Sequence, residues 1–244
     1  MNKNLSDYPL LELLDVKSLL QDYPIKEKGN EEDKERNEAI GKIFDAIAIK
    51  LFNEYHIKKG DSTYDFLEIE FYYFDRGHKD YITYPRTIGK GKWFFHPSGM
   101  DLSFESSCIE GFKKTSEAGN YFFGGILIRG LVKDGNNAII GPLNSCWGLF
   151  DIFSAFEANP NELPIIEPKS VENQFEIFKS QRWIPFNEEK ADKDYEGNFG
   201  NFKTHLPKLY RYYVKRQVLI KDKSKLYKAQ PWKAGSEDKR VNEY

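Results

Sequence analysis

The sequence predicts a single α+β domain in which a curved, mostly antiparallel β-sheet or partial barrel is packed by peripheral helices. Three observations predict this fold class. Two segments near the N-terminus place apolar residues at helical spacing, the middle of the chain carries short aromatic-rich segments between glycines and asparagines, and aromatic residues make up 16% of the 244 residues. With 40% hydrophobic and 30% charged residues the chain can bury a core, which excludes global disorder.

The first 60 residues are predicted to hold peripheral helices. Leucines and a valine form an apolar stripe over residues 6–20, which predicts a short amphipathic helix. Pro24 and Gly29 interrupt the chain, and the charged run 26–38 is expected to be a solvated loop and the first turns of a second helix. That helix is expected to end near His56, and its buried face is predicted from the spacing of Ile40, Ile43, Phe44, Ile47, Leu51 and Phe52.

Residues 64–156 are predicted to form the core of the sheet, because segments dense in Phe, Tyr, Ile and Leu alternate with turn residues. The expected strands are 64–74, 93–96, 100–105, 121–132 and 138–140. Residues 127–132 and 138–140 are candidates for a hairpin across Asp-Gly-Asn-Asn. Gly141-Pro142 should open a helix over residues 143–156, and Asn159-Pro160 should end it.

The C-terminal segment 201–244 is strongly basic, with 12 Lys and Arg against 4 Asp and Glu, a local balance of +8 in a chain of net charge −2. A final helix is predicted over residues 206–218. Its basic side chains, which could contact nucleic acid, are Lys208, Arg211, Lys215 and Arg216. The alternative is a solvated, partly frayed tail.

The sequence indicates a cytoplasmic protein. Acidic residues interrupt the apolar part of the N-terminus, so no signal peptide is expected, and no stretch of about 18 apolar residues predicts a membrane span. The two cysteines, Cys108 and Cys146, are too few for a disulfide framework. No zinc-binding spacing occurs among the four histidines, so neither a metal nor another cofactor is predicted.

The densest cluster of reactive side chains lies at residues 68–80. In a strand, Glu68, Glu70 and Tyr72 share one face, so a carboxylate is flanked by aromatic rings and followed by His78. Such a pocket could hold a flat ligand and activate water. The alternative is a half-exposed strand with an acidic outer face.

Three further charges need an explanation. Lys90 and Lys92, in the sequence GKGK, could contact a phosphate together with backbone amides, or could simply form a basic hairpin tip. Arg129 is a single charge in an apolar strand, and it therefore needs either an internal carboxylate or an anionic ligand. Gly124-Gly125 suggests a bulge, or backbone that lies close to another group.

Four segments in the middle of the chain follow one another in a characteristic order. They are EIEFY at 68–72 with His78 after it, WFFHPSGM at 93–100, GGILIRGL at 124–131 and GPLNSC at 141–146. This order resembles the methylpurine (alkyladenine) DNA glycosylase family, which has ETEAY and a histidine, a strand ending in YGM, a GxxLLRAL strand and a GPxxLC helix start. The resemblance covers roughly residues 64–156.

The resemblance implies roles for particular residues. Glu70 matches the glutamate that activates the attacking water, Tyr72 and His78 match the residues that sandwich a flipped base, and Arg129 matches an arginine near the catalytic and phosphate-binding region. Glu105 stands where the family has an asparagine in the substrate site. The implied reaction is hydrolysis of the N-glycosidic bond of a modified base, and it needs no metal.

Three functional hypotheses follow. The first is a DNA glycosylase-like enzyme acting on a base in DNA, in single-stranded nucleic acid or in a free nucleotide. The second is a non-catalytic nucleic-acid or nucleotide binding module on the same fold. The third is a protein-interaction scaffold that uses the acidic strand face and the basic tail. The sequence predicts no oligomeric state.

Overall fold

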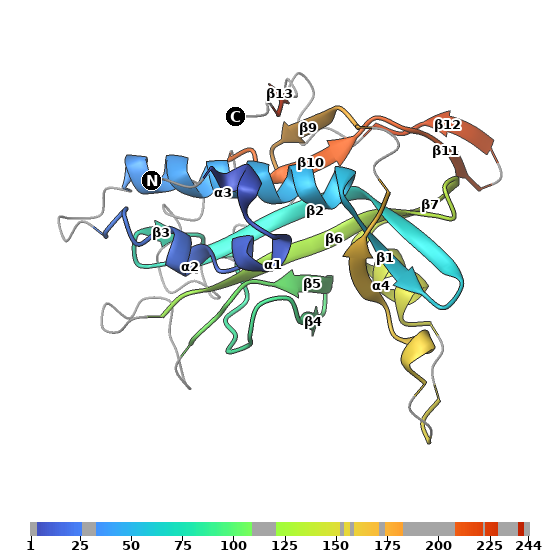
Figure 1. The fold of residues 1–244 in the computed structure, drawn as a ribbon, viewed down its shortest axis with the longest axis horizontal. Helices are drawn as coiled ribbons and strands as arrows, with labels where there is room; N and C mark the ends of the chain where they lie inside the picture. The colour runs from blue at the N-terminus through green and yellow to red at the C-terminus, as the bar shows by residue number, and fades with distance from the viewer. Residues whose placement is uncertain are drawn as a thin grey trace, which may run out of the picture.

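The computed structural model describes residues 4–25, 33–108, 121–151, 154–156, 159–170, 174–182, 208–221, 223–228 and 239–241. Within these ranges a long helix crosses a curled sheet that forms a half-barrel (Figure 1). The helices are α1 (Leu10–Leu13), α2 (Val16–Leu19), α3 (Lys34–Asn53) and α4 (Pro142–Leu149), with 3₁₀ turns η1 (Leu5–Asp7) and η2 (Pro160–Glu162). The strands are β1 (Tyr55–Lys59), β2 (Ser62–Asp75), β3 (His78–Lys79), β4 (Trp93–His96), β5 (Gly99–Ser103), β6 (Phe123–Lys133), β7 (Asn137–Ile140), β8 (Ile165–Pro168), β9 (Ile177–Ser180), β10 (Arg211–Val214), β11 (Gln217–Ile220), β12 (Lys223–Leu226) and β13 (Lys239–Arg240).

The long strands β2 and β6 form the middle of the sheet. The main path runs β12-β11-β7-β6-β2-β10-β9-β13, while β5 and β4 continue from β6, and β1 and β8 from β2. Among the described strands only the β11–β7 pair is parallel. The predicted α+β class with a curved, mostly antiparallel sheet is therefore confirmed.

Helix α3 covers one face of this sheet and packs its apolar side against the strands. Phe44 of α3 stacks on Phe71 of β2 at a ring-centroid distance of 4.5 Å and on Phe104 at 5.9 Å. Tyr212 of β10 donates a hydrogen bond to Asp45 of α3 at 2.6 Å. All these side chains are buried, and a fully buried Phe stabilises the fold by about 1.5–3 kcal/mol.

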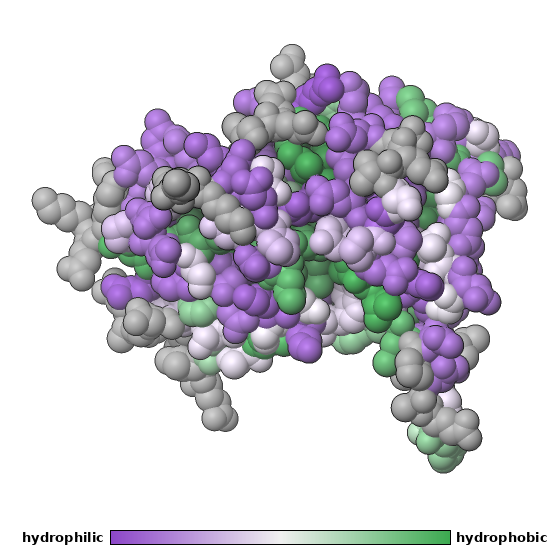
Figure 2. Space-filling model, in the orientation of Figure 1, coloured by the Kyte–Doolittle hydropathy of each residue, from purple (hydrophilic) through white to green (hydrophobic). Residues whose placement is uncertain are grey.

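The outer side of α3 is polar. Figure 2 shows hydrophilic residues over most of this side of the molecule, with hydrophobic residues between them. None of the helices within the described ranges is both long and apolar enough to cross a bilayer.

The prediction of one continuous helix over residues 6–20 is wrong. The structure has η1, α1 and α2 in its place, because the Asp15 side chain accepts a hydrogen bond from the Ser18 amide and starts a new turn. Several of the leucines in this stretch are nevertheless buried. The second helix ends at Asn53, and His56 lies in β1.

The C-terminal helix predicted over residues 206–218 is wrong where the structure describes this segment. Residues 211–214 form β10, which pairs with β2 and β9, and residues 217–220 form β11. Tyr212, Tyr213 and Val214 favour a pleated, buried strand, and the open edge of β2 offers backbone partners that an isolated helix lacks. Tertiary pairing overrides the weak helical spacing.

The helix predicted at 143–156 is shorter than expected. Helix α4 ends at Leu149, and Phe156, the last residue of the predicted helix, is 98% exposed. The predicted hairpin is confirmed: β6 and β7 pair antiparallel, and Asp134 and Gly135 turn between them with φ of 47° and 78°.

Gly124 provides a sharp test of the β2–β6 packing. A Cβ atom on Gly124 would lie 2.3 Å from the Tyr72 carbonyl oxygen, whereas one on Gly41 of α3 would meet no atom within 4 Å. We expect Gly124→Ala to lower the free energy of unfolding by about 1–3 kcal/mol or more, because backbone must move. Gly41→Ala should raise it by about 0.5–1 kcal/mol. Urea denaturation of both variants measures this, and changes of the same sign would contradict the packing described.

Candidate functional site

The face of the sheet opposite α3 carries a row of charged side chains. Register places Asp101 of β5 opposite Leu127 of β6, Leu127 opposite Glu70 of β2, and Glu70 opposite Arg211 of β10. Residues directly opposite one another project from the same face of a sheet. Because Phe71 faces α3, its neighbour Glu70 and this whole row point away from α3.

Glu70 lies at the centre of the row and is fully buried. Its Oε2 accepts hydrogen bonds from the Tyr72 hydroxyl at 2.7 Å and from Arg129 Nη1 at 3.2 Å. The structure thus brings together three of the predicted site residues. Burial raises the pKa of Tyr72 well above its ordinary value, and the adjacent Glu70 raises it further. The tyrosine is therefore a hydrogen-bond donor to the carboxylate.

Arg129 has internal carboxylate partners. Its charge in an apolar strand is therefore compensated within the protein and does not require an anionic ligand. Its Nε donates to Glu68 at 2.8 Å, and its Nη1 pairs with Glu70. Burial alone would lower the pKa of Arg129, but Glu70 and Glu68 outweigh it and raise that pKa. The guanidinium therefore stays charged, and 14% of its side chain is exposed.

Glu68 is the second centre of the cluster, and no functional role was predicted for it. It receives Arg211 Nε at 2.7 Å, Arg129 Nε and the Tyr227 hydroxyl. Burial alone would raise the pKa of Glu68, but Arg211 and Arg129 lower it overall. Arg211, predicted as a nucleic-acid contact, is only 2% exposed and is internal. The strand alternation of Glu68 with Glu70 is the signal that could have found this residue.

A second buried pair adjoins Tyr72. Arg182 and Asp80 are both fully buried and form two contacts, Nη1–Oδ2 at 2.6 Å and Nη2–Oδ1 at 3.1 Å. The Arg182 guanidinium carbon lies 4.8 Å from the centroid of the Tyr72 ring. One side of that ring is therefore covered by a cation. Arg182 lies in a segment that sequence patterns left irregular, and no periodicity pointed to it.

His78 does not join this site. It is fully buried on the side of α3, where its Nδ1 contacts the Asn37 side chain and its ring lies 6.1 Å from that of Tyr73. Asp75 accepts hydrogen bonds from the amides of Gly77 and His78, and this turn directs the histidine toward α3. Tyr72 and His78 thus lie on opposite faces of the sheet, and the predicted sandwich of a base between them is wrong.

Glu105 also lies apart from the cluster. Its backbone amide donates to Leu14 beside the N-terminal helices, and its carboxylate accepts from the Lys90 amide at 3.0 Å. The Lys90 ammonium is paired with Asp15 at 3.1 Å. Glu105 therefore shapes the glycine-rich turn, and only Lys92 of the two predicted lysines is exposed there.

The remaining predicted basic contacts differ in exposure and in partners. Arg216 is paired with Asp65 at 2.6 Å, and Lys208 is half-buried. Lys215 is exposed, with its ammonium 3.7 Å from the ring centroid of Phe178.

A third charged group shares the face with Glu70. Asp101 lies 2.7 Å from Arg86 Nη1 and 3.0 Å from His96 Nε2, and Phe94 covers the Arg86 guanidinium at 3.9 Å. A Cβ on Gly125 would lie 3.0 Å from Arg86 Nη1. This close approach accounts for the glycine, as its position in a strand suggested. Burial lowers the pKa of Arg86, and Asp101 offsets part of that effect.

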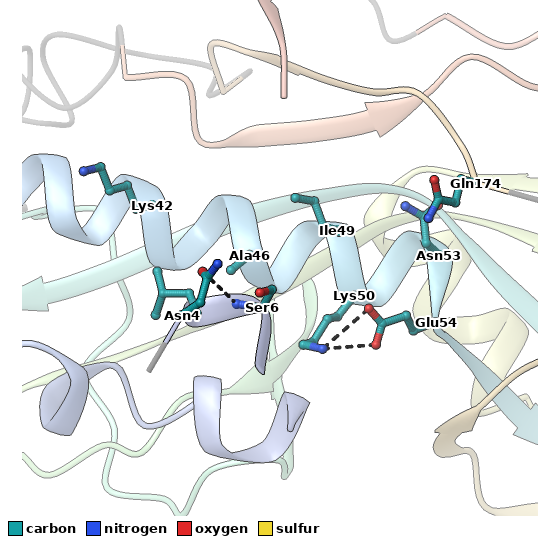
Figure 3. Close-up of a pocket in the computed structure, with 10 residues that line it drawn as sticks. Asn4, Ser6, Lys42, Ala46, Ile49, Lys50, Asn53, Glu54 and Gln174 are labelled. Carbon is teal, nitrogen blue, oxygen red and sulfur yellow. Dashed lines mark hydrogen bonds and ion pairs between the residues drawn. The ribbon is translucent and has the colours of Figure 1, made fainter. Parts of the chain in front are cut away.

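Two described grooves lie elsewhere. One, of about 590 Å³, runs along the outer side of α3 past Lys42, Ala46 and Ile49 (Figure 3). The other, of about 430 Å³, lies between α3 and β9. Neither is lined by the charged face that holds Glu70. In the described part of the chain, no three His, Cys, Asp or Glu side chains gather in a group that could hold a metal.

Comparison of the chain with protein-family models, with functionally described proteins and with solved structures gives no match.

Proposed function

We propose that the chain hydrolyses the N-glycosidic bond of a nucleobase, with Glu70 as the general base. One observation carries this proposal: Arg129 of β6 meets Glu70 and Tyr72 of β2, and the resemblance singles out all three residues. The carboxylate is held by a neighbouring cation and a hydroxyl, so its orientation is fixed before any ligand arrives.

In the proposed reaction, Glu70 takes a proton from a water molecule whose oxygen forms a bond to C1′ of the sugar. The C1′–N bond breaks, and its electron pair leaves with the base, which takes a proton from solvent. Arg129 compensates the charge of Glu70, and Tyr72 provides one wall for a flat base. His78 and Glu105 have no part in it.

Access is the requirement that the geometry imposes. Glu70 is fully buried, whereas Tyr72 is half-buried and Arg129 is partly exposed, so the carboxylate lies one layer below the surface. The proposed reaction therefore requires that a water molecule reach the Glu70 carboxylate when substrate binds. This same burial favours the second candidate, a nucleotide-binding module that uses Tyr72 without any catalytic base.

Base release separates the two candidates. Wild-type protein is incubated with modified DNA, modified RNA and free nucleosides, and released base is measured by mass spectrometry. We expect release from at least one substrate, and a loss of about 100-fold or more in Glu70→Gln. Glu35→Gln, which removes an exposed carboxylate, is the matched control and should retain full activity.

Circular dichroism shows whether Glu70→Gln is folded, and Glu70→Asp keeps the charge while moving it by one methylene. Equal release by wild type and folded Glu70→Gln removes Glu70 from its role. Binding of a nucleoside without release supports the binding module instead.

A further inference from the structure

Strands β11 and β12 form a two-stranded ribbon at one end of the main sheet path. They pair antiparallel from Gln217 with Leu226 to Ile220 with Lys223, and β12 has no further strand beside it in the described sheet. The ribbon projects past β7 from the body of the molecule (Figure 1). All four residues of β12 are exposed.

The ribbon is strongly basic. Residues 215–228 hold five Lys and one Arg against one Asp, a balance of +5. Four exposed lysines form no ion pair with any described residue: Lys221, Lys223, Lys225 and Lys228. By contrast Arg216, at the base of the ribbon, is already paired with Asp65. The free charge is therefore concentrated on β12 and its two ends.

The spacing of these charges is regular. Lys223 and Lys225 are two residues apart on one strand, so they share a face and lie about 6.8 Å from each other along it. Phosphates two nucleotides apart on one strand of B-DNA are separated by about the same distance along the helix axis, because the rise is about 3.4 Å per nucleotide. A two-stranded ribbon also fits the dimensions of the major groove, about 12 Å wide.

The base of the ribbon is fixed to the charged face of the sheet. The Tyr227 amide donates to the Arg216 carbonyl at 2.8 Å, which closes the ribbon, and the Tyr227 hydroxyl reaches Glu68. A polyanion bound along β12 would therefore lie on a ribbon that is hydrogen-bonded to the cluster containing Glu70.

We propose that the β11–β12 ribbon binds the phosphate backbone of a nucleic acid through Lys221, Lys223, Lys225 and Lys228. A protein partner would need an apolar centre to its interface, and Leu226 is the one large apolar side chain exposed on the described ribbon. The same shortage of apolar and aromatic anchors disfavours a lipid surface. This inference is independent of catalysis at Glu70.

Fluorescence anisotropy with a labelled 20-base-pair duplex, and with a single strand of the same length, tests the proposal. At low salt, changing the four ribbon lysines to Gln should weaken binding at least tenfold and should reduce the slope of log K against log salt by about 2–4. A matched variant changes four exposed lysines elsewhere to Gln: Lys34, Lys42, Lys58 and Lys239.

The matched variant should bind nearly as tightly as wild type. Equal weakening in both variants would show an effect of net charge alone and overturn the proposal, as would wild-type affinity in the ribbon variant or an absence of binding by wild type. Ribbon-dependent binding of polyglutamate or of anionic vesicles, but not of DNA, would reassign the partner and also overturn it. If the ribbon variant binds DNA normally but aggregates, the lysines protect an edge strand.

Binding is measured without base release, so its outcome is separate from that of the proposed reaction. A ribbon that binds DNA in a protein that releases no base supports this inference and contradicts the proposed function.

Discussion

Replacing Glu68 with Gln is expected to lower the free energy of unfolding by about 3–5 kcal/mol. The carboxylate receives Arg211 Nε at 2.7 Å and Arg129 Nε at 2.8 Å, and it is 3% exposed. Glu68→Gln removes the carboxylate that both arginines contact, while Arg129 keeps its ion pair with Glu70. A buried charge without its partner loses the attraction that offset its desolvation.

The same contact predicts how stability depends on pH. Because Arg211 and Arg129 hold the pKa of Glu68 below its ordinary value, the contribution of Glu68 is fully present above the pKa of the unfolded chain, about 4.3. This contribution is lost as the pH falls from there toward the lower pKa that Glu68 has in the folded protein. Wild type should therefore lose stability below about pH 4.3, and Glu68→Gln should lose less over the same range.

Urea denaturation at pH 7 and at pH 3.5 measures both effects. Glu54→Gln is the control, because Glu54 pairs with Lys50 at 3.1 Å but is 41% exposed, and it should change stability by about 0–1 kcal/mol. A change in Glu68→Gln no larger than that of the control would show that the cluster carries little of the stability.

Replacing Asp80 with Asn should have an effect of similar size, about 3–5 kcal/mol. Arg182 and Asp80 are both fully buried, and the arginine also donates to the Phe71 carbonyl at 3.2 Å. Since the Arg182 guanidinium carbon lies 4.8 Å from the centroid of the Tyr72 ring, loss of Asp80 should also change the environment of Tyr72. Thermal unfolding and tyrosine fluorescence report the two changes.

The pair can be distinguished from a general loss of packing. Asp80→Leu combined with Arg182→Met replaces both charges with apolar groups and should recover most of the lost stability. Glu176→Gln breaks the exposed pair with Arg240 and should change stability by about 0–1 kcal/mol. A double variant as unstable as Asp80→Asn would mean that shape, not charge compensation, dominates at this position.

The periodic parts of the chain could be predicted from sequence because one local pattern dictates each. The apolar face of α3 and the aromatic run of β2 are found where the spacing of Ile, Phe and Tyr placed them. Residues 211–220 could not be predicted in this way. The pairing that makes a strand of Arg211–Val214 comes from β2, about 140 residues earlier in the chain.

The candidate site was predictable in part for the same reason. Glu70 and Tyr72 share a face by alternation, and Arg129 required a partner, so their meeting follows from strand geometry. The position of His78 depends on a turn in which Asp75 accepts hydrogen bonds from two backbone amides. No local sequence pattern determines on which face of the sheet the His78 side chain lies after that turn. The resemblance supplied a role for His78 but not the geometry that this role requires.

Tyr227 connects the β11–β12 ribbon to the buried cluster. Its hydroxyl ends on Glu68, whose other oxygen receives Arg129, which in turn contacts Glu70. Movement of the ribbon relative to the sheet should therefore strain this chain of contacts. A change at Glu70 should in turn affect how firmly the ribbon is held. A ligand that binds the ribbon and a change in the charge of Glu70 are therefore expected to influence each other.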